Sequence, residues 1–235
     1  TTPMSIVAEY GASAVPAAGC GGLQDGAFVF LDAGTSAASP DLSRYFVFRF
    51  PTNYPAAPAF NPPNQPKPIT LYNDPDNLKN CATDASCIDN VNRDAHGMGM
   101  VKARGNRTRF LHQFDRIRNN VEVFNTRTLR HMGTYSLTTV NGQTTGAPGT
   151  ACGTTLGATT SNDPTPDLLD ISPQNDRFYV ALRGPFPLTV AHAASGSCPG
   201  LGIVKIKKGG KSGALQYTLP TTWLNFDGTQ NISDR

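Results

Sequence analysis

The sequence predicts an all-β fold in which units of four antiparallel strands follow one another within a single domain, residues 1–235. An arginine followed by aromatic and β-branched residues recurs at Arg44, Arg109 and Arg177 with nearly equal spacing, and self-similarity of this kind indicates a repeat architecture. Short apolar runs of strand length follow each arginine, which predicts one repeated β-hairpin. Charged residues form only 16% of the chain, which holds 23 Gly and 19 Pro, as expected of many turns joining short strands.

The middle unit shows the pattern best. Residues 96–103 predict a first strand, and residues 108–114 predict a second strand after a tight turn. Residues 121–124 alternate as a half-buried strand does, and residues 132–137 predict the fourth. Four antiparallel strands joined by short turns form a meander.

The third unit repeats this order with a longer insertion. Strands are predicted at 168–171, 178–182, 202–206 and 214–219. Residues 183–201, rich in Gly, Pro and Ser, predict a loop between the second and third strands.

The first unit is the least regular. Residues 45–50 predict a strand, but the prolines of residues 51–68 favour extended coil before a short strand at 69–72. We expect residues 26–31 to close a preceding unit. The predicted repeats are therefore approximately 26–72, 94–140 and 165–220.

Tandem four-stranded meanders are typical of a β-propeller. Three segments, residues 94–98, 119–126 and 172–184, are similar to the YVTN and lactonase-like group of seven-bladed propellers. The resemblance implies three to four blades, too few to close a ring of seven, so the chain is expected to be part of a larger ring. Its expected partners are the missing blades or other protein chains, because open blade edges invite association.

The five cysteines favour an oxidising compartment. Cys81 and Cys87 flank a short loop with little apolar surface, which predicts a disulfide. A second bridge between Cys152 and Cys198 is an alternative to free thiols, and Cys20 is left over. The chain starts with neither a Met nor an apolar signal segment, as a processed chain or a fragment would. The sequence therefore favours an extracellular, periplasmic or lumenal location.

Charge and hydropathy bear on partners. The net charge is +3, and the lysines of residues 205–211 are expected to lie in a solvated turn, so no nucleic-acid partner is predicted. No apolar run reaches the roughly 20 residues that a membrane span needs. Asn106 and Asn231 begin glycosylation sequons, which matter only in a chain secreted from a eukaryotic cell; unmodified turn asparagines are the alternative.

Histidines and carboxylates mark one candidate site. In a propeller, Asp94, His96 and His192 fall on the same face as the long insertions, and we consider that they bind a metal ion or act as acid and base near the channel. The alternative is that each histidine hydrogen-bonds the backbone of a neighbouring blade.

Calcium is the other metal considered. The resemblance implies oxygen ligands around calcium in the channel, for which Asp167 and Asp170 are the nearest candidates. The acidic segment at residues 73–77 is a second calcium candidate, with a solvated turn as its alternative.

These observations predict a non-enzymatic propeller module outside the cytoplasm that is a binding or structural component of a larger assembly. No Gly-x-Ser-x-Gly motif is present. The alternative function is a metal-dependent hydrolase or oxidoreductase with its site in the channel, using His96 and His192. A third possibility is carbohydrate binding through Tyr54, Phe60 and Tyr72.

Overall fold

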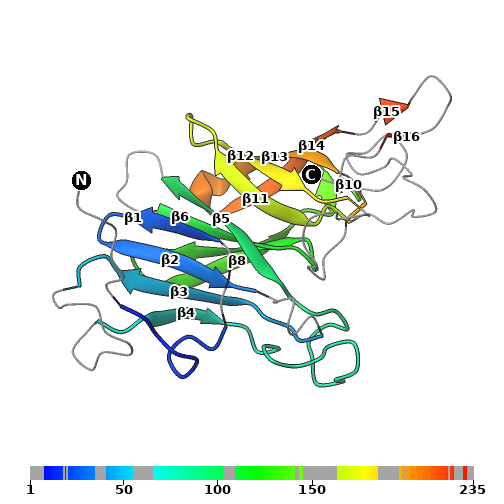
Figure 1. Ribbon diagram of the computed structural model, residues 1–235. Helices are drawn as coiled ribbons and strands as arrows, with labels where there is room; N and C mark the ends of the chain where they lie inside the picture. Colours follow the sequence, from blue (N-terminus) through cyan, green and yellow to red (C-terminus); the bar gives the residue numbers. More distant parts are fainter. Residues whose placement is uncertain are drawn as a thin grey trace.

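The computed structural model (Figure 1) describes residues 8–17, 19, 21–34, 41–54, 66–102, 109–140, 143–144, 163–184, 196–197, 199–221, 223–224 and 230–231. This part of the chain is all-β and forms three four-stranded antiparallel sheets. They do not close into a ring, although their stacking is compatible with propeller blades. In the described ranges, no helix has the length and apolar character needed to cross a membrane.

The first and second sheets are meanders of consecutive strands. The first contains β1 (Gly22–Asp25), β2 (Phe28–Ala33), β3 (Phe46–Pro51) and β4 (Ile69–Asn73). The second contains β5 (Ala95–Lys102), β6 (Arg109–Asp115), β7 (Asn120–Asn125) and β8 (Arg130–Ser136).

The third sheet follows the same order. Its four antiparallel strands are β11 (Pro166–Ile171), β12 (Arg177–Leu182), β13 (Gly200–Lys207) and β14 (Ser212–Pro220). β9 (Thr139–Val140) adds in parallel to β14 and pairs with β10 (Gln143–Thr144). A short 3₁₀ turn, Lys208–Gly210, joins β13 to β14, and β15 (Trp223–Leu224) pairs separately with β16 (Gln230–Asn231).

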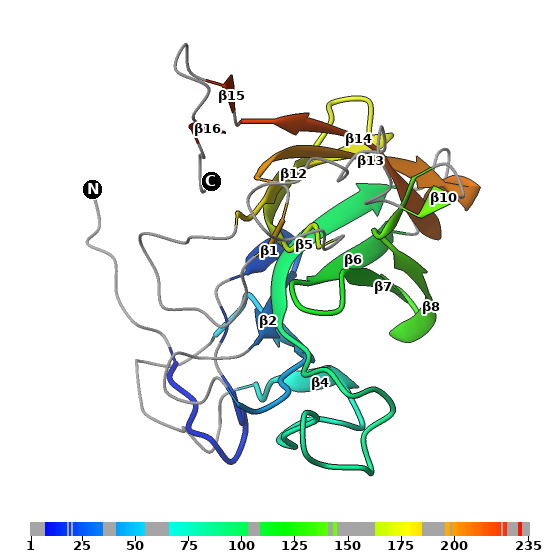
Figure 2. The same ribbon diagram turned by 90° about the vertical axis from the view of Figure 1, so that its right-hand side faces the viewer.

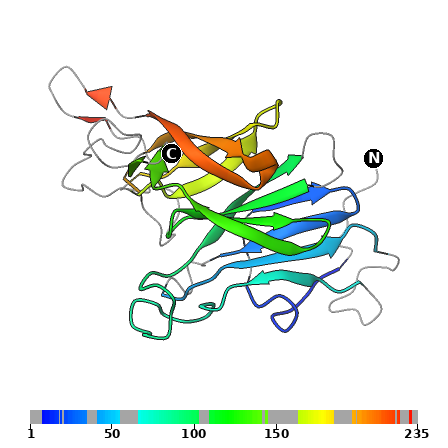
Figure 3. The same cartoon turned by 180° about the vertical axis from the view of Figure 1, so that it is seen from behind.

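The sheets stack face to face, as Figures 2 and 3 show, with the second sheet between the first and the third. The side chains of β7 explain this position. Val121 and Val123 pack toward the third sheet, whereas Phe124 packs toward the first. Because successive side chains of a strand point to opposite faces, the four consecutive buried residues of β7 require cover on both faces of the sheet.

The first strands of the three sheets lie together at the centre. β5 packs against both β1 and β11. Glycines in β5 permit the close approach of the third sheet: a Cβ at Gly99 would lie 2.4 Å from a ring carbon of Phe178, and one at Gly97 would lie 2.2 Å from the Asp167 carbonyl oxygen.

A buried histidine ties the second sheet to the third. His112 is fully buried, its Nε2 donates to the Gly210 carbonyl oxygen at 2.8 Å, and its Nδ1 accepts from the Tyr135 hydroxyl at 3.0 Å. Burial lowers the pKa of His112 to about 4, although the Gly210 bond opposes that shift. The imidazole is therefore neutral near pH 7 and has a structural role.

The strand predictions for the second and third sheets are confirmed, but two predictions for the first are wrong. Residues 26–31 do not close a preceding unit, because most of them belong to β2, the second strand of the first sheet. Arg44 precedes the third strand of its sheet, whereas Arg109 and Arg177 begin second strands. An arginine before an aromatic run is compatible with any strand that follows a turn. The shared motif therefore did not establish which strand of its sheet each arginine precedes.

Candidate functional site

Polar side chains gather where β1, β5 and β11 begin. We call this group the polar cluster; its members are Asp32, Asp94, His96, Gln113, Arg116 and Asp167. The second strand of each sheet ends beside the start of the first, so this end of the stack brings together residues that are far apart in the sequence. All are buried except Asp167, whose side chain is 27% exposed.

Asp32 is the most perturbed carboxyl group of the cluster. It is 2% exposed; its Oδ1 accepts from the Gly21 N–H at 2.9 Å and its Oδ2 from Gln113 Nε2 at 3.1 Å. Burial raises the pKa of Asp32 to about 7, because these two hydrogen bonds and His96 only partly offset the loss of hydration, and Asp94 adds to the rise. Asp32 therefore exchanges a proton near neutral pH.

Ion pairs join the second and third sheets in the same cluster. Nε and Nη2 of Arg116 lie 2.8 and 2.6 Å from Oδ2 of Asp94, and its Nη1 lies 3.3 Å from Oδ1 of Asp167. The same Asp167 oxygen lies 2.6 Å from Nδ1 of His96. Burial alone would raise the pKa of Asp167, but the hydrogen bond with His96 and the nearby charges of His96, Arg116 and Arg183 lower it overall.

The geometry limits the chemistry that the cluster can perform. A histidine oriented by a carboxylate is a common arrangement for moving a proton. However, both Asp94 and Asp167 already bind buried or half-buried cationic groups. The contacts therefore favour a structural role, in which the polar cluster connects the three sheets, over a role for Asp94 as a metal ligand.

Arg93 forms a second polar centre between the first and second sheets. Its Nη1 lies 2.5 Å from Asp74, its Nε 2.7 Å from Asp115 and its Nη2 2.8 Å from Glu122. Its guanidinium carbon lies 3.8 Å from the centre of the Tyr45 ring. Four buried partners from four separate segments hold this one side chain, so it connects β6 and β7 with the residue that follows β4 and the residue that precedes β3.

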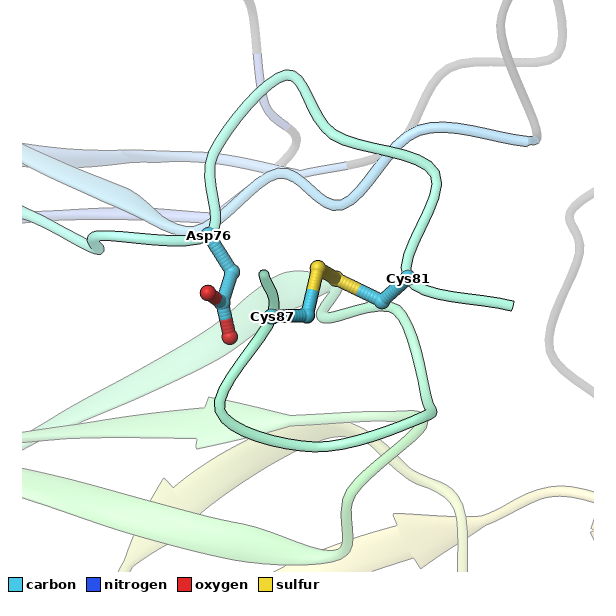
Figure 4. A group of neighbouring side chains, drawn as sticks. All are labelled: Asp76, Cys81 and Cys87. Atoms are coloured by element: carbon cyan, nitrogen blue, oxygen red, sulfur yellow. A yellow bond between two sulfur atoms is a disulfide. The ribbon is translucent and has the colours of Figure 1, made fainter. Parts of the chain in front are cut away.

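The predicted Cys81–Cys87 disulfide is confirmed. Figure 4 shows it beside Asp76, and these three residues form the only group of three potential metal-ligating side chains found within the described ranges. Both sulfur atoms are bonded to each other, so they offer no thiolate to a metal ion. Asp76 is fully buried and binds Arg118 at 3.1 Å and Lys79 at 3.4 Å.

The prediction that residues 73–77 form a solvated turn is wrong for its two aspartates, although Asn73 and Pro75 are exposed. Asp74 and Asp76 are both buried and each is paired with an arginine. Burial would raise the pKa of Asp76, but its bonds from Arg118, the Ile88 N–H and Lys79 lower it overall. The arginines that bury this turn come from later parts of the chain, so its own composition did not reveal them.

Reduction of the Cys81–Cys87 disulfide, or the paired change Cys81→Ser with Cys87→Ser, is expected to lower the free energy of unfolding by about 2 kcal/mol, because the open chain gains loop entropy on unfolding. Urea unfolding with and without dithiothreitol measures the effect. Identical midpoints for the wild type and the double variant in the absence of dithiothreitol would contradict it, because this comparison leaves the other three cysteines unchanged.

Several predicted residues lie outside the described residues: His192, Cys20, Cys152, Cys198, Asn106 and Phe60. The proposed meeting of Asp94 and His96 with His192, the second disulfide and modification at Asn106 therefore stay predictions. Asn231 ends β16. Asp170 is exposed, on the opposite face of β11 from Leu169, whereas Asp167 joins the polar cluster.

Sequence reasoning missed Asp32 and Gln113, and a signal for Asp32 was available. Both Asp32 and Asp115 follow the apolar run of a second strand, and each accepts a hydrogen bond from the N–H of the residue before a first strand, Gly21 and Asp94 respectively. An aspartate at this position in two repeats indicates a repeated structural contact.

Comparisons of the chain with models of known protein families, with curated proteins and with solved structures found no match.

Proposed function

We propose that the chain is a non-enzymatic β-propeller-type module that acts outside the cytoplasm as a structural or binding component of a larger assembly. One observation carries this proposal: the face of the third sheet that points away from the second sheet has two rows of exposed or half-buried apolar side chains, next to the charged residues Asp170, Arg177 and Lys205.

This outer face of the third sheet has two cross-strand rows. Tyr179, Ile203 and Tyr217 are paired across β12, β13 and β14, as are Ala181, Leu201 and Leu219. Their neighbours in the strands, such as Val180 and Val204, are the residues that pack on the second sheet. The two rows therefore share the opposite face.

The exposure of this face is unusual for a sheet. Tyr217 is 58% exposed, Leu219 52% and Leu201 37%; Leu168 of β11, at 56%, is exposed next to the buried-face residue Leu169. Contiguous exposed apolar surface marks interaction sites. Covering each of these side chains would contribute about 1–3 kcal/mol.

The stacking of the described sheets suggests what covers this face. The second sheet packs against the third through rows of aliphatic and aromatic side chains, and it packs against the first in the same way on its other side. A further four-stranded antiparallel sheet would continue the series. We infer that this occupant comes from missing blades or another chain; in the isolated protein, a second copy is the available source.

The described polar residues support a structural role more than an enzymatic one. Asp94 is bound to Arg116, and His96 is bound to Asp167. The metal-dependent hydrolase or oxidoreductase that the sequence also suggested therefore has less support. The disulfide supports a location outside the cytoplasm, because cytoplasmic thiols are kept reduced.

The isolated chain, of 25.0 kDa, is expected to associate through this outer face. Native mass spectrometry and light scattering should give a mass that exceeds that of one chain and rises with concentration. The double variant Leu168→Lys with Tyr217→Lys should remain monomeric, because burying a lysine without a partner is unfavourable.

Ile88→Lys is the matched control, because Ile88 is 76% exposed in the disulfide loop, far from this face in the sequence. It should associate as the wild-type chain does. A wild-type chain that is a stable monomer at every concentration would overturn the proposal.

A further inference from the structure

We propose that a cleft at the other end of β5 from the polar cluster binds a small organic phosphate. The cleft has a volume of about 550 Å³ and lies between the second and third sheets. Known ligand pockets have volumes of roughly 300–1,000 Å³, so it is large enough for a small ligand.

Three segments form the walls of the cleft. They are the end of β5 at Val101 and Lys102, the β11–β12 turn at residues 174–176, and residues 206–210 around the β13–β14 turn. In Figure 1 the orange turn between β13 and β14 lies beside the end of β5. The cleft exists only because the two sheets are packed together.

Hydrogen bonds between the sheets hold these walls in place. The side-chain oxygen of Asn175 accepts from the Lys102 N–H at 3.1 Å, and its Nδ2 donates to the Lys102 carbonyl oxygen at 2.5 Å. On the opposite wall, His112 donates to the carbonyl oxygen of Gly210. A pre-formed site loses less conformational entropy when a ligand binds.

The rim of the cleft is positively charged. Lys102, Lys207 and Lys208 line it, and all three are exposed. Within the described part of the chain, none of their ammonium groups forms an ion pair with a carboxylate. Lysine ammonium groups are established binders of phosphate oxygens, and three around one cleft attract a multiply charged anion.

Among the described residues that line the cleft, Asp176 is the one carboxylate, and neighbouring cations already neutralise it. Asp176 Oδ2 lies 2.6 Å from Lys205 Nζ and 2.7 Å from Arg177 Nη1. The bond from Lys205 is the main reason that the pKa of Asp176 is lowered, and burial opposes it only in part. Lys205 and Arg177 therefore balance the negative charge of Asp176, and Asp176 does not oppose the binding of an anion in the cleft.

The floor of the cleft is apolar. Val101 is 2% exposed, Ile206 packs on the core between the sheets, and Gly210 approaches the ring of Phe110. An apolar floor below a lysine rim fits a ligand with a small organic body and a phosphate group. Lys207 and Lys208, which the sequence alone placed in a solvated turn, thus contribute to a site completed by Lys102.

Titration calorimetry with phenyl phosphate at low ionic strength and pH 7.5 tests the proposal. The wild-type chain should bind one equivalent. The double variant Lys207→Gln with Lys208→Gln should bind about tenfold more weakly, a loss of about 1.4 kcal/mol. The double variant Lys67→Gln with Arg130→Gln is the control, because it also removes two positive charges from exposed positions and neither residue lines the cleft; its affinity should equal that of the wild type.

Three further probes separate the contributions to binding. Inorganic phosphate, which lacks the organic body, and phenol, which lacks the charge, should both bind more weakly than phenyl phosphate. Phenyl sulfate, with a single negative charge, should also bind more weakly. No saturable binding by the wild type, equal affinity of the double variant, or equal or tighter binding of phenol or phenyl sulfate would overturn the proposal. The outcome of this binding test does not depend on whether the chain associates through the outer face of the third sheet.

Discussion

Arg93→Met is expected to lower the free energy of unfolding by about 3–5 kcal/mol, because it leaves buried carboxylates without their cation. Asp74, Asp115 and Glu122 all contact this guanidinium. Arg93 is 3% exposed, so water cannot replace the lost contacts. Chemical denaturation of the variant and the wild type at pH 7 measures the loss.

The pH dependence of this loss tests its cause. Burial would raise the pKa of Glu122, but the hydrogen bond from His131 and the charge of Arg93 lower it overall. Without Arg93 the carboxyl groups are more easily protonated, and a neutral carboxyl tolerates burial far better than a charged one. The difference between variant and wild type should therefore shrink as the pH falls toward about 4.

Arg130→Met is the matched control, because Arg130 is exposed in β8 of the same sheet. It should change the free energy of unfolding by less than about 0.5 kcal/mol. If Arg93→Met were as mild as this control, or if its effect were the same at pH 4 and pH 7, buried charge pairing would not explain the contacts of Arg93.

Asp32→Asn is expected to stabilise the chain relative to the wild type increasingly as the pH rises, by up to about 4 kcal/mol above pH 8. Burial raises the pKa of Asp32 from 3.8 to about 7. A carboxyl whose folded pKa is raised contributes full stability below its unfolded pKa, and that stability is lost as the pH rises from 3.8 to 7. An amide in its place carries no charge to bury.

The informative quantity is the stability of Asp32→Asn minus that of the wild type, measured from pH 4 to pH 8. The subtraction cancels groups that both proteins share, including His112, whose pKa of about 4 makes the folded state less stable as the pH falls from 6.5 toward 4. If Asp32→Asn loses the hydrogen bonds to Gly21 and Gln113, the stability difference would be lower by the same amount at every pH. Its slope against pH would not change. A difference independent of pH would show that the folded pKa of Asp32 is not raised.

The strands of the second and third sheets could be predicted because their signals are local. Residues 121–124 alternate with a period of two within one strand, and β12 follows a short turn at residues 173–176. The first sheet was harder because residues 51–68 lack a strand pattern, so the strand at 28–33 was assigned to a preceding unit. The Cys81–Cys87 disulfide was predictable for the same reason of proximity.

The candidate site could be predicted only in part. Asp94, His96 and Asp167 were singled out from the sequence, but their partners were not. Arg116 lies 22 residues from Asp94, and Gln113 lies 81 residues from Asp32. Pairings over such separations depend on how the sheets stack, and no local pattern encodes them.

The amino-acid sequence by itself determined the all-β class, most of the strands and one disulfide, because each depends on alternation, turns or cysteines within a few residues. Only the tertiary structure decided that Asp74 and Asp76 are buried, that burial raises the pKa of Asp32 to about 7, and that Lys102 lines the same cleft as Lys207 and Lys208. These properties depend on the hydration that each group loses and on the charges brought near it. Both are set by the packing of one sheet on the next.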